Sequence, residues 1–242
     1  DSSLVLSMLE TNGFEIIPIA VGRPKAIKNV IEEINKPSIH IERKISANLL
    51  KLNEQGALNG HIPITGVFAF LLALSGVLYN FRYVAMANER SANIGNTISG
   101  EGLEVNHQWS KSFEFENSFD NLIKKIIPEF SYFSLLRAFS ELEIARRFAK
   151  LERYHAVFTS CNNAFKIQEE LRTEKWCCNC PKCRFVFLSL APFLEKSAMI
   201  NIFGQNLLND ENQLQGFKEL LGLENFKPFE CVGEIEESQT AF

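Results

Sequence analysis

Hydrophobic residues alternate between helical and strand-like spacing along the first part of the chain. Residues 2–11 place apolar side chains on one face of a predicted helix, and Asn12-Gly13 ends that helix as a C-cap does. The apolar run 14–21 is typical of a buried strand and stops before Gly22. The chain therefore opens with a helix followed by a strand.

The same alternation continues up to residue 87. A helix, a strand, a helix and a strand are predicted in turn over residues 25–35, 38–45, 63–80 and 83–87. This order predicts an α/β layered fold with a mainly parallel sheet, whose first strand is expected upstream of Asp1. Ligands of such sheets bind beyond the carboxyl ends of the strands, which here follow Val21, Ile45 and Ala87.

The remainder of the chain has a more helical pattern. Helices are predicted over 109–127, 140–153 and 211–223, with a compact apolar segment at 185–194. The acidic tail, residues 233–242, is expected to be frayed. We predict two domains, residues 1–105 with the α/β pattern and residues 106–242 with the helical one.

Composition limits the class of protein. Hydrophobic residues make up 46% of the 242 residues and charged residues 22%, with a net charge of -4. These values exclude a disordered tail and a basic nucleic-acid coat, so no nucleic-acid partner is expected. The longest apolar run, 66–81, is interrupted by polar residues and is shorter than the roughly 20 residues of a membrane span. The chain opens inside a helical pattern, without Met or a signal peptide, so a fragment of a cytoplasmic protein is expected.

The strongest motif is a group of cysteines. Cys177, Cys180 and Cys183 have the spacing CxxCxxC, and Cys161 lies upstream of them. Four thiolates from two loops match a tetrahedral structural zinc site. Cys178 is an alternative to Cys177 as a ligand, and a set of unpaired buried cysteines is the alternative to a metal site.

Three polar segments are candidates for binding or catalysis. The segment NERSANIGN follows a predicted strand and suits a loop whose amides face an anion, although a plain solvent loop has the same composition. His107 titrates near neutrality at a predicted helix start, where it can exchange protons or only cap the helix. His61 and Thr65 flank another helix start, where free amides and the helix dipole favour phosphate; capping alone explains the same residues.

The start of the chain resembles the end of the SGGxDS phosphate loop of N-type ATP pyrophosphatases, because Asp1-Ser2 precede an apolar helix and a buried strand. The loop Ser160-Cys161 and the run from Cys177 to Arg184 are similar to the zinc loop of a nitrile synthase in that superfamily. The resemblance implies a Rossmann-like adenine nucleotide alpha hydrolase (PP-loop) fold. Residues 1–105 would bind ATP, lacking the first strand and most of the phosphate loop, and residues 106–242 would carry the metal loop.

A closer resemblance covers roughly residues 1–233. It is carried by five segments in order, GHIPIT, MANERSANIGN, EVNHQWSKSFEFE, SLLRAFSELEIARRFA and CPKCRFVFLSLAPFL, which together resemble the bacterial UDP-N-acetylmuramoyl-L-alanyl-L-glutamate epimerase (MurL) family. That family inverts the terminal L-Glu of a peptidoglycan precursor with ATP and Mg²⁺, and releases AMP and diphosphate. Its members are longer and have a further amino-terminal region.

The resemblance implies a cytoplasmic enzyme with ATP, Mg²⁺ and structural Zn²⁺, acting on a UDP-N-acetylmuramoyl dipeptide. Adenylation neutralises the substrate carboxylate, so that a base can remove the α-proton and reprotonation on the other face inverts the centre. Glu89, His107 and Lys111 are the catalytic candidates, and the proton-transfer pair is left unassigned. The residues expected at ATP and its phosphates are Asp1, Ser2, His61, Thr65, Asn88 and Ser91.

Two other functions are compatible with the same residues. One is an adenylating ligase of the same superfamily, which forms an amide or nitrile and therefore consumes ammonia or an amine. The other is a non-catalytic, zinc-stabilised binding domain. The sequence leaves the oligomeric state open.

Overall fold

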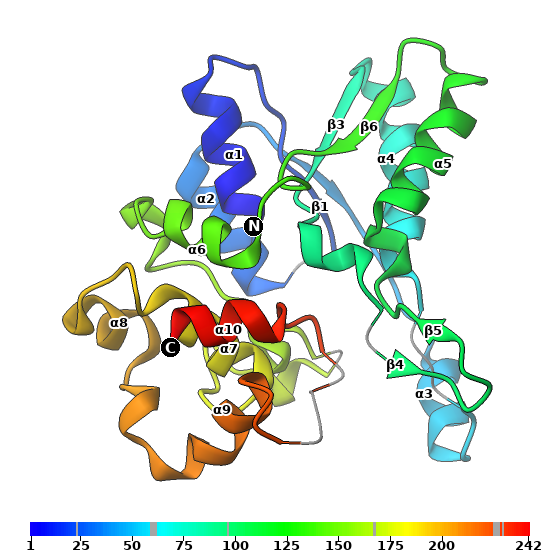
Figure 1. The fold of residues 1–242 in the computed structure, drawn as a ribbon. Coiled ribbons are helices and arrows are strands. Elements are labelled where there is room, and N and C mark those ends of the chain that lie inside the picture. Colours follow the sequence, from blue (N-terminus) through cyan, green and yellow to red (C-terminus); the bar gives the residue numbers. More distant parts are fainter. Residues whose placement is uncertain (23, 59–61, 96, 167, 225–227, 229) are drawn as a thin grey trace.

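Three layers form the first part of the molecule (Figure 1). Helices α1 (Ser2–Thr11) and α2 (Lys25–Ile34) lie on one side of the strands, and α4 (Ile64–Tyr79) and α5 (Phe113–Lys124) lie on the other. The predicted α/β layering is confirmed in this part of the chain. The computed structural model describes residues 1–22, 24–58, 62–95, 97–166, 168–224, 228 and 230–242.

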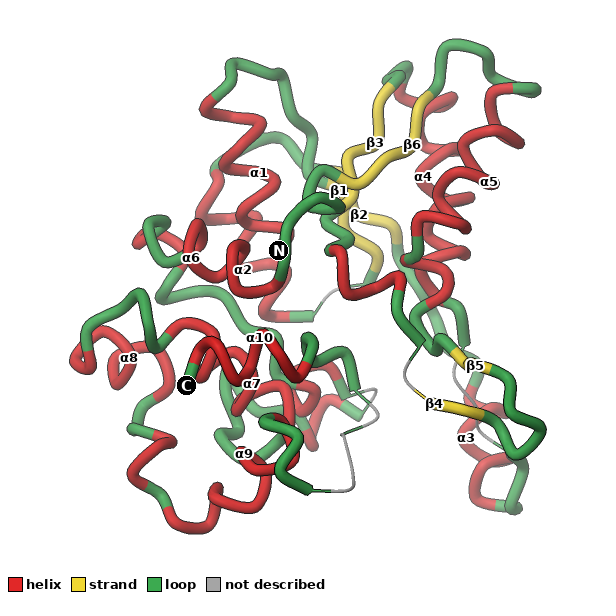
Figure 2. The backbone as a smooth tube through the Cα atoms, in the orientation of Figure 1, coloured by secondary structure: helices red, strands yellow, loops and turns green. Residues whose placement is uncertain are grey.

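Two parallel pairs of strands occupy the middle layer. β1 (Ile19–Val21) pairs with β2 (Ile39–Ile41), and β3 (Tyr83–Met86) pairs with β6 (Ser131–Ser134). Figure 2 shows the two pairs next to each other between the helices. The parallel arrangement is as predicted, but the described strands form separate pairs instead of one sheet. The other elements of this part are the helix α3 (Ala47–Glu54) and the antiparallel strands β4 (Thr97–Ile98) and β5 (Glu104–Val105).

Strand β3 shows how the layers are built, because successive side chains of a strand point to opposite faces. Val84 and Met86 pack into the core formed with α4, α5 and β6. Ala85 and Ala87 instead pack against α1 and α6 (Glu141–Phe148), beside Leu4. A short apolar strand with both faces covered is the pattern of a buried parallel sheet.

The second part of the molecule is a helical unit around α7 (Pro181–Leu190). This helix is apolar on most sides and is packed by α6, α9 and α10, as expected for a helix buried in a core. Pro181 occupies the first position of α7, where a backbone N–H would have no partner within the helix, so proline loses no hydrogen bond there. The remaining helices of this unit are α8 (Lys196–Phe203), α9 (Leu214–Leu220) and α10 (Ile235–Ala241).

Serine caps fix two helix starts, one later than the periodicity predicted and one where it was predicted. Ser112 accepts a hydrogen bond from the Phe115 amide at 3.2 Å, so α5 begins at Phe113 after a 3-10 turn at Trp109–Lys111. Ser140 accepts from the Glu143 amide at 3.1 Å and starts α6 as predicted. A cap fixes a boundary that apolar spacing leaves uncertain.

Two sequence predictions are wrong in detail. The strand predicted over 14–21 is only Ile19–Val21, because Phe14 is exposed and Pro18 has no N–H for a ladder. The predicted frayed tail is instead helix α10, in which Glu237 and Ser238 are buried. Glu234 and Glu237 form a capping box that starts this helix. The acidic residues that suggested a frayed tail therefore include the pair that caps the helix.

The predicted boundary between residues 105 and 106 falls before α5 and β6, both of which pack with β3 and α4. The division into two domains at that point remains a prediction. None of the helices in the described residues is long and apolar enough to cross a membrane.

Candidate active site and metal centre

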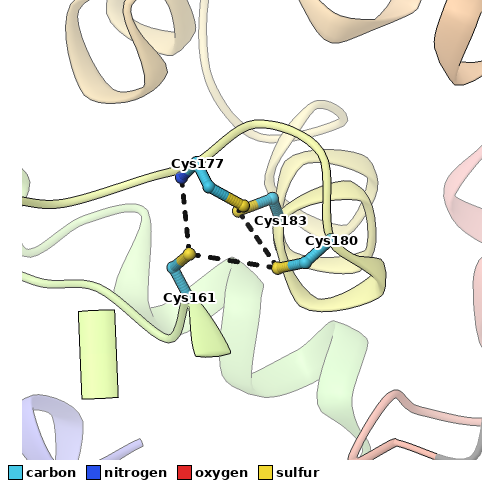
Figure 3. A group of neighbouring side chains, drawn as sticks. All are labelled: Cys161, Cys177, Cys180 and Cys183. Atoms are coloured by element: carbon cyan, nitrogen blue, oxygen red, sulfur yellow. Dashed lines mark hydrogen bonds between the residues drawn. The ribbon is translucent and has the colours of Figure 1, made fainter. Parts of the chain in front are cut away.

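Four cysteine thiols converge beside the start of α7 (Figure 3). The Sγ atoms of Cys161, Cys177, Cys180 and Cys183 all lie within 4.8 Å of one another. Individual separations are 3.9 Å for Cys161–Cys180, 3.8 Å for Cys177–Cys183 and 3.5 Å for Cys180–Cys183. Four sulfurs at about 2.3 Å from a central Zn²⁺ would be about 3.8 Å apart, so the cluster fits a tetrahedral ion.

The local backbone decides which of the two adjacent cysteines joins the cluster. Cys178 has a left-handed φ of 57°, and its buried thiol donates a hydrogen bond to the Phe203 carbonyl at 3.2 Å. Cys177 points to the cluster, and its amide donates to the Cys161 sulfur at 3.3 Å. Cys177 is therefore the ligand candidate, and Cys178 belongs to the core.

One thiol of the cluster is favoured as a thiolate. Hydrogen bonds from Cys180 and Cys183 hold the pKa of the Cys161 thiol well below its ordinary value, while the contact with Cys161 raises the pKa of Cys180 and Cys183. The amide of Cys177 also lowers the pKa of Cys161. A thiolate is the form that binds a metal, so the arrangement suits a metal centre of four thiolates.

A second group of polar residues lies at the carboxyl ends of β3 and β6. Asn88 follows β3 and donates from Nδ2 to the Ser134 hydroxyl at 3.0 Å, and Ser134 donates to the Glu116 carboxylate. Arg137 Nη2 pairs with Glu116 Oε2 at 2.9 Å. Asn88 is buried, so the structure places it in this network and not at the cavity that Asp1 and Ser2 line.

Arg137 joins two segments that the sequence analysis singled out separately. Its Nη1 donates to the Glu89 carbonyl at 3.1 Å, and its Nη2 donates to the Lys111 carbonyl at 2.7 Å. Both carbonyls belong to loops, one leading into the 3-10 turn Arg90–Asn93 and one within the turn Trp109–Lys111. The guanidinium thus holds the loop after β3 beside the loop that carries His107.

Three glutamates gather at the same end of β3. Glu89 is 5% exposed and Glu237 is 8% exposed. Glu141 starts α6, accepts from the Ser91 hydroxyl at 3.1 Å, and its amide donates to Glu237 at 3.0 Å. The structure therefore brings Glu89 and Ser91 together, as predicted for neighbours in one loop, and adds two carboxylates from distant segments.

The environment of Glu141 alters its protonation. Burial raises the pKa of Glu141 to about 7, the negative charges of Glu89 and Glu237 add to the rise, and Lys182 opposes it. Burial also raises the pKa of Glu237. A carboxyl that titrates near neutrality can take or give a proton at physiological pH, and such perturbed groups cluster at functional sites.

A thiol, an imidazole and an ammonium group meet at the turn that Arg137 holds through the Lys111 carbonyl. Cys231 Sγ lies 3.7 Å from His107 Nε2 and 3.9 Å from Lys111 Nζ. Gln108 accepts from Lys111 Nζ at 3.0 Å, and the loop is fixed by Asn106, whose side chain bonds Ala92 and Gln108. The predicted pair His107 and Lys111 is therefore brought together, with Cys231 as a third member from 124 residues away.

The other predicted phosphate residues lie in different places. Asp1 and Ser2 line a cavity of about 1360 Å³, together with Glu141 and the loop residues Thr159 and Ser160. Thr65 is buried in the first turn of α4, which packs against the turn Trp109–Lys111, and it does not line that cavity. His61 lies outside the described residues.

Sequence reasoning missed Glu141, Glu237, Lys182 and Cys231 as site residues. The first three are ordinary helix residues by their spacing, and only tertiary packing brings them to Glu89. Cys231 is remote from every other cysteine in sequence. Its position outside the CxxCxxC group was the one available signal that it has a separate role.

Comparison with known families identifies the class of protein. A family model described as the MurL N-terminal domain matches residues 1–135, and one described as the MurL C-terminal domain matches residues 157–242. The chain therefore belongs to the MurL family.

Curated relatives extend the match over the whole chain. A protein of Xanthomonas oryzae pv. oryzae is 45% identical over all 242 residues, which are 53% of its own length. Proteins of Micromonospora sp. and Salinispora tropica are each 44% identical over the whole chain, which covers 54% and 52% of their lengths. All three are named UDP-N-acetyl-alpha-D-muramoyl-L-alanyl-L-glutamate epimerase. The chain spans about half the length of the curated relatives it matches.

Proposed function

We propose that the chain forms part of an epimerase that inverts the terminal L-Glu of UDP-N-acetylmuramoyl-L-alanyl-L-glutamate, an isomerase of peptidoglycan precursor synthesis. The observation that carries the proposal is that Arg137 holds the loop of Glu89 beside the turn that ends at Lys111, at the carboxyl end of β3. The whole-chain identity to proteins named for this reaction gives the substrate class. The carboxyl ends of parallel strands are where α/β folds bind ligands.

The chemical difficulty of the reaction explains why ATP is required. Removing the α-proton of a free carboxylate would place a carbanion beside an existing negative charge. Transfer of AMP to the carboxylate, with release of diphosphate, removes that charge and gives an acyl group that withdraws electrons. The α-proton then becomes removable, reprotonation on the opposite face gives D-Glu, and water releases AMP.

Some residues near the cavity are proposed to bind the nucleotide, and others are proposed to bind a cation. Asp1 and Ser2 line the cavity at the start of α1, where backbone amides and the helix dipole favour phosphate. Glu89 and Glu141 supply carboxylate oxygens and Ser91 a hydroxyl, the donor types that Mg²⁺ prefers. When bound, Mg²⁺ would neutralise diphosphate charge. Burial, together with repulsion from Glu89 and Glu237, raises the pKa of Glu141, and a cation between these carboxylates would offset both effects.

Proton transfer is assigned to the group around Cys231. The Cys231 thiol and the His107 imidazole are 3.7 Å apart, close enough for one to hold the other's proton as the substrate arrives. Lys111 Nζ lies 3.9 Å from the same sulfur. Inversion needs an acid and a base on opposite faces of Cα, and a thiol–imidazole pair supplies two groups that can each carry a proton.

The four-cysteine cluster is proposed to hold structural Zn²⁺. Its sulfur spacing fits a tetrahedral ion, and all four coordination positions are taken by protein. A closed site leaves no position for substrate. The metal would stabilise the helical unit around α7 and take no part in the reaction.

The test uses the full-length natural protein with ATP, Mg²⁺ and the UDP-N-acetylmuramoyl-L-alanyl-L-glutamate substrate. AMP release and glutamate chirality are followed, with and without added ammonia. D-Glu formed together with AMP and without any amine is the expected result. AMP formed only when an amine is supplied would assign a ligase instead, and a protein that turns over no nucleotide would be a binding domain.

A further inference from the structure

A second cavity, of about 1270 Å³, lies between the hairpin of β4 and β5, the turn Trp109–Lys111 and the start of α5. We call it the hairpin cavity, and Figure 1 shows the hairpin beyond the start of α5. Its described lining residues are all different from those of the cavity that Asp1 and Ser2 line. Small-molecule sites are concave and largely formed before the ligand binds, so this hollow is a second candidate ligand site.

Two aromatic side chains at the hairpin cavity are open to solvent. Trp109 is 44% exposed and Phe113 is 56% exposed, although both are large apolar groups. Leu103 and Val105 of the hairpin add further exposed apolar surface to the same lining. Apolar surface gathered in a hollow marks a ligand-binding groove more often than scattered single residues do.

The surrounding structure holds both rings in place. The Trp109 amide donates to the Asn106 carbonyl at 3.1 Å, and the Phe113 amide donates to the Asn93 side chain at 2.7 Å. The indole also makes an edge-to-face contact with Phe115, with 5.4 Å between the ring centroids. Rings that are fixed before a ligand arrives lose little conformational entropy when it binds.

The charges at the hairpin cavity disfavour a phosphate group. Glu101, Glu104 and Glu114 line it, and Arg137 is the only Lys or Arg among its described lining residues. Both Nη atoms of Arg137 already bond protein oxygens. A diphosphate would therefore meet like charges, whereas hydroxyl groups can donate hydrogen bonds to the carboxylates.

Aromatic faces beside carboxylates suit an uncharged sugar ring. The face of an aromatic ring carries partial negative charge, which attracts the C–H groups on one side of a pyranose. Carboxylates accept hydrogen bonds from the hydroxyls around its edge. The substrate of the proposed reaction contains one such ring, the N-acetylmuramoyl group between its diphosphate and its peptide.

The turn Trp109–Lys111 connects the hairpin cavity to the proposed proton-transfer group. Trp109 lines the cavity at one end of the turn, and Lys111 at the other end lies 3.9 Å from Cys231 Sγ. In the substrate, a lactyl group and one alanine separate the sugar from the reacting glutamate, a span of about 10 Å at roughly 3.5 Å per residue. The uridine diphosphate leaves the sugar at another position and extends away from the peptide.

We propose that the hairpin cavity binds the N-acetylmuramoyl ring of the substrate, with Trp109 and Phe113 against the ring and the carboxylates at its hydroxyls. This inference rests on the proposed function, because that function supplies the sugar. It assigns the recognition of the sugar to a site next to the proton-transfer group and separate from the proposed nucleotide site.

The test measures binding of UDP-N-acetylmuramate to the full-length protein by isothermal titration calorimetry. This compound has the sugar but no peptide, so no glutamate is turned over. Trp109→Ala should weaken binding by about tenfold or more, and Trp109→Phe, which keeps a ring, should restore most of it. Phe70→Ala is the matched control and should bind as the native protein does, because Phe70 is 54% exposed on α4 and lies outside the described lining.

Unchanged binding by Trp109→Ala, an equal loss in Phe70→Ala, or no binding by the native protein would overturn the proposal. UDP alone is the second ligand, and native protein and Trp109→Ala should bind it equally. A loss of UDP binding in Trp109→Ala would place the uracil ring in the cavity and overturn the assignment to the sugar.

Turnover of the native protein separates this proposal from the proposed function. A native protein that forms D-Glu while Trp109→Ala binds UDP-N-acetylmuramate normally keeps the function and loses the sugar site. A native protein that forms no D-Glu but binds the compound through Trp109 loses the function and keeps the sugar site.

Discussion

At the scale of single residues, different surroundings give Glu141 and Glu143 very different pKa values, although both lie in the same helix. Burial raises the pKa of Glu141 to about 7, whereas Arg146 and Arg147 lower the pKa of Glu143 to about 2. Both stand in the first turn of α6, where their sequence context is similar. The arginines that act on Glu143 lie three and four residues along the helix, whereas the burial of Glu141 and its neighbour Glu89 come from tertiary packing, which no local pattern records.

Replacing Glu141 by Gln should change how stability depends on pH. The folded-state pKa of Glu141 lies above its unfolded value, so its neutral form stabilises the fold below pH 4.5. That stability is lost as the pH rises to about 7, and the loss amounts to a few kcal/mol at most. Glu141→Gln keeps the acceptor for Ser91 and should flatten the fall in Tm between pH 5 and pH 8.

Glu143→Gln is the matched control. The lowered pKa of Glu143 means that its contribution is present above pH 4.5 and is lost only as the pH falls to about 2. Its Tm profile should therefore run parallel to that of the native protein between pH 5 and pH 8. A Glu141→Gln profile that also runs parallel would contradict the raised pKa.

Cys231→Ser should separate the two halves of the reaction. A hydroxyl is a far weaker acid than a thiol, so D-Glu formation is expected to fall by about 10²- to 10⁴-fold. AMP transfer from ATP, measured as exchange of labelled diphosphate into ATP, should be retained. Cys178→Ser is the control, since its buried thiol donates to the Phe203 carbonyl and a hydroxyl can do the same. Equal D-Glu rates for Cys231→Ser and the native protein would remove Cys231 from the mechanism.

At the scale of elements, Arg137 holds the loop after β3, the turn Trp109–Lys111 and α5 together through one guanidinium. Apolar periodicity predicted helices α1, α2 and α4 and the parallel arrangement of the strands, but not helices α3, α8 and α10. It did not predict strand β6, since Ser131–Ser134 is short and its partner β3 lies far back in the chain. Nor did it predict the network through Asn88, because a buried hydrogen bond leaves no periodic signal.

Arg137→Met should destabilise the protein strongly. The side chain of Glu116 is 9% exposed, so loss of its partner leaves a buried carboxylate unpaired, at a cost of about 3–5 kcal/mol. Chemical denaturation would measure this change. Arg82→Met is the control, because its pair with Glu129 is exposed and should contribute no more than about 1 kcal/mol. Similar losses of unfolding free energy in both variants would show that the Arg137 network stabilises the fold no more than an exposed ion pair does.

At the scale of the whole molecule, the cysteine spacing predicted a metal ligand set that the structure assembles from two distant segments. Cys161 and Cys183 are fully buried there, which the motif does not reveal. The proposed catalytic residues were less predictable. Glu89, His107 and Lys111 lie on segments that the sequence marks, but Glu237 and Cys231 arrive through the packing of α10 and its preceding loop.

Loss of the metal should unfold the helical unit around α7. Cys161→Ser is expected to reduce zinc content from one ion per chain to a small fraction of that, and to lower Tm, because folding of such sites is coupled to metal binding. Metal analysis and thermal unfolding measure the two effects. Cys178→Ser should keep the zinc, since its sulfur lies outside the cluster. Full zinc content in Cys161→Ser would contradict the ligand assignment.

The most direct test of the central claim is turnover of the full-length protein in D₂O, with mass and chirality of the glutamate product measured against AMP. Removal and return of the α-proton through protein groups predicts that D-Glu carries one deuterium at Cα and appears with one AMP per molecule. D-Glu formed without AMP, or AMP formed while glutamate stays L and undeuterated, would contradict an epimerase that acts through adenylation.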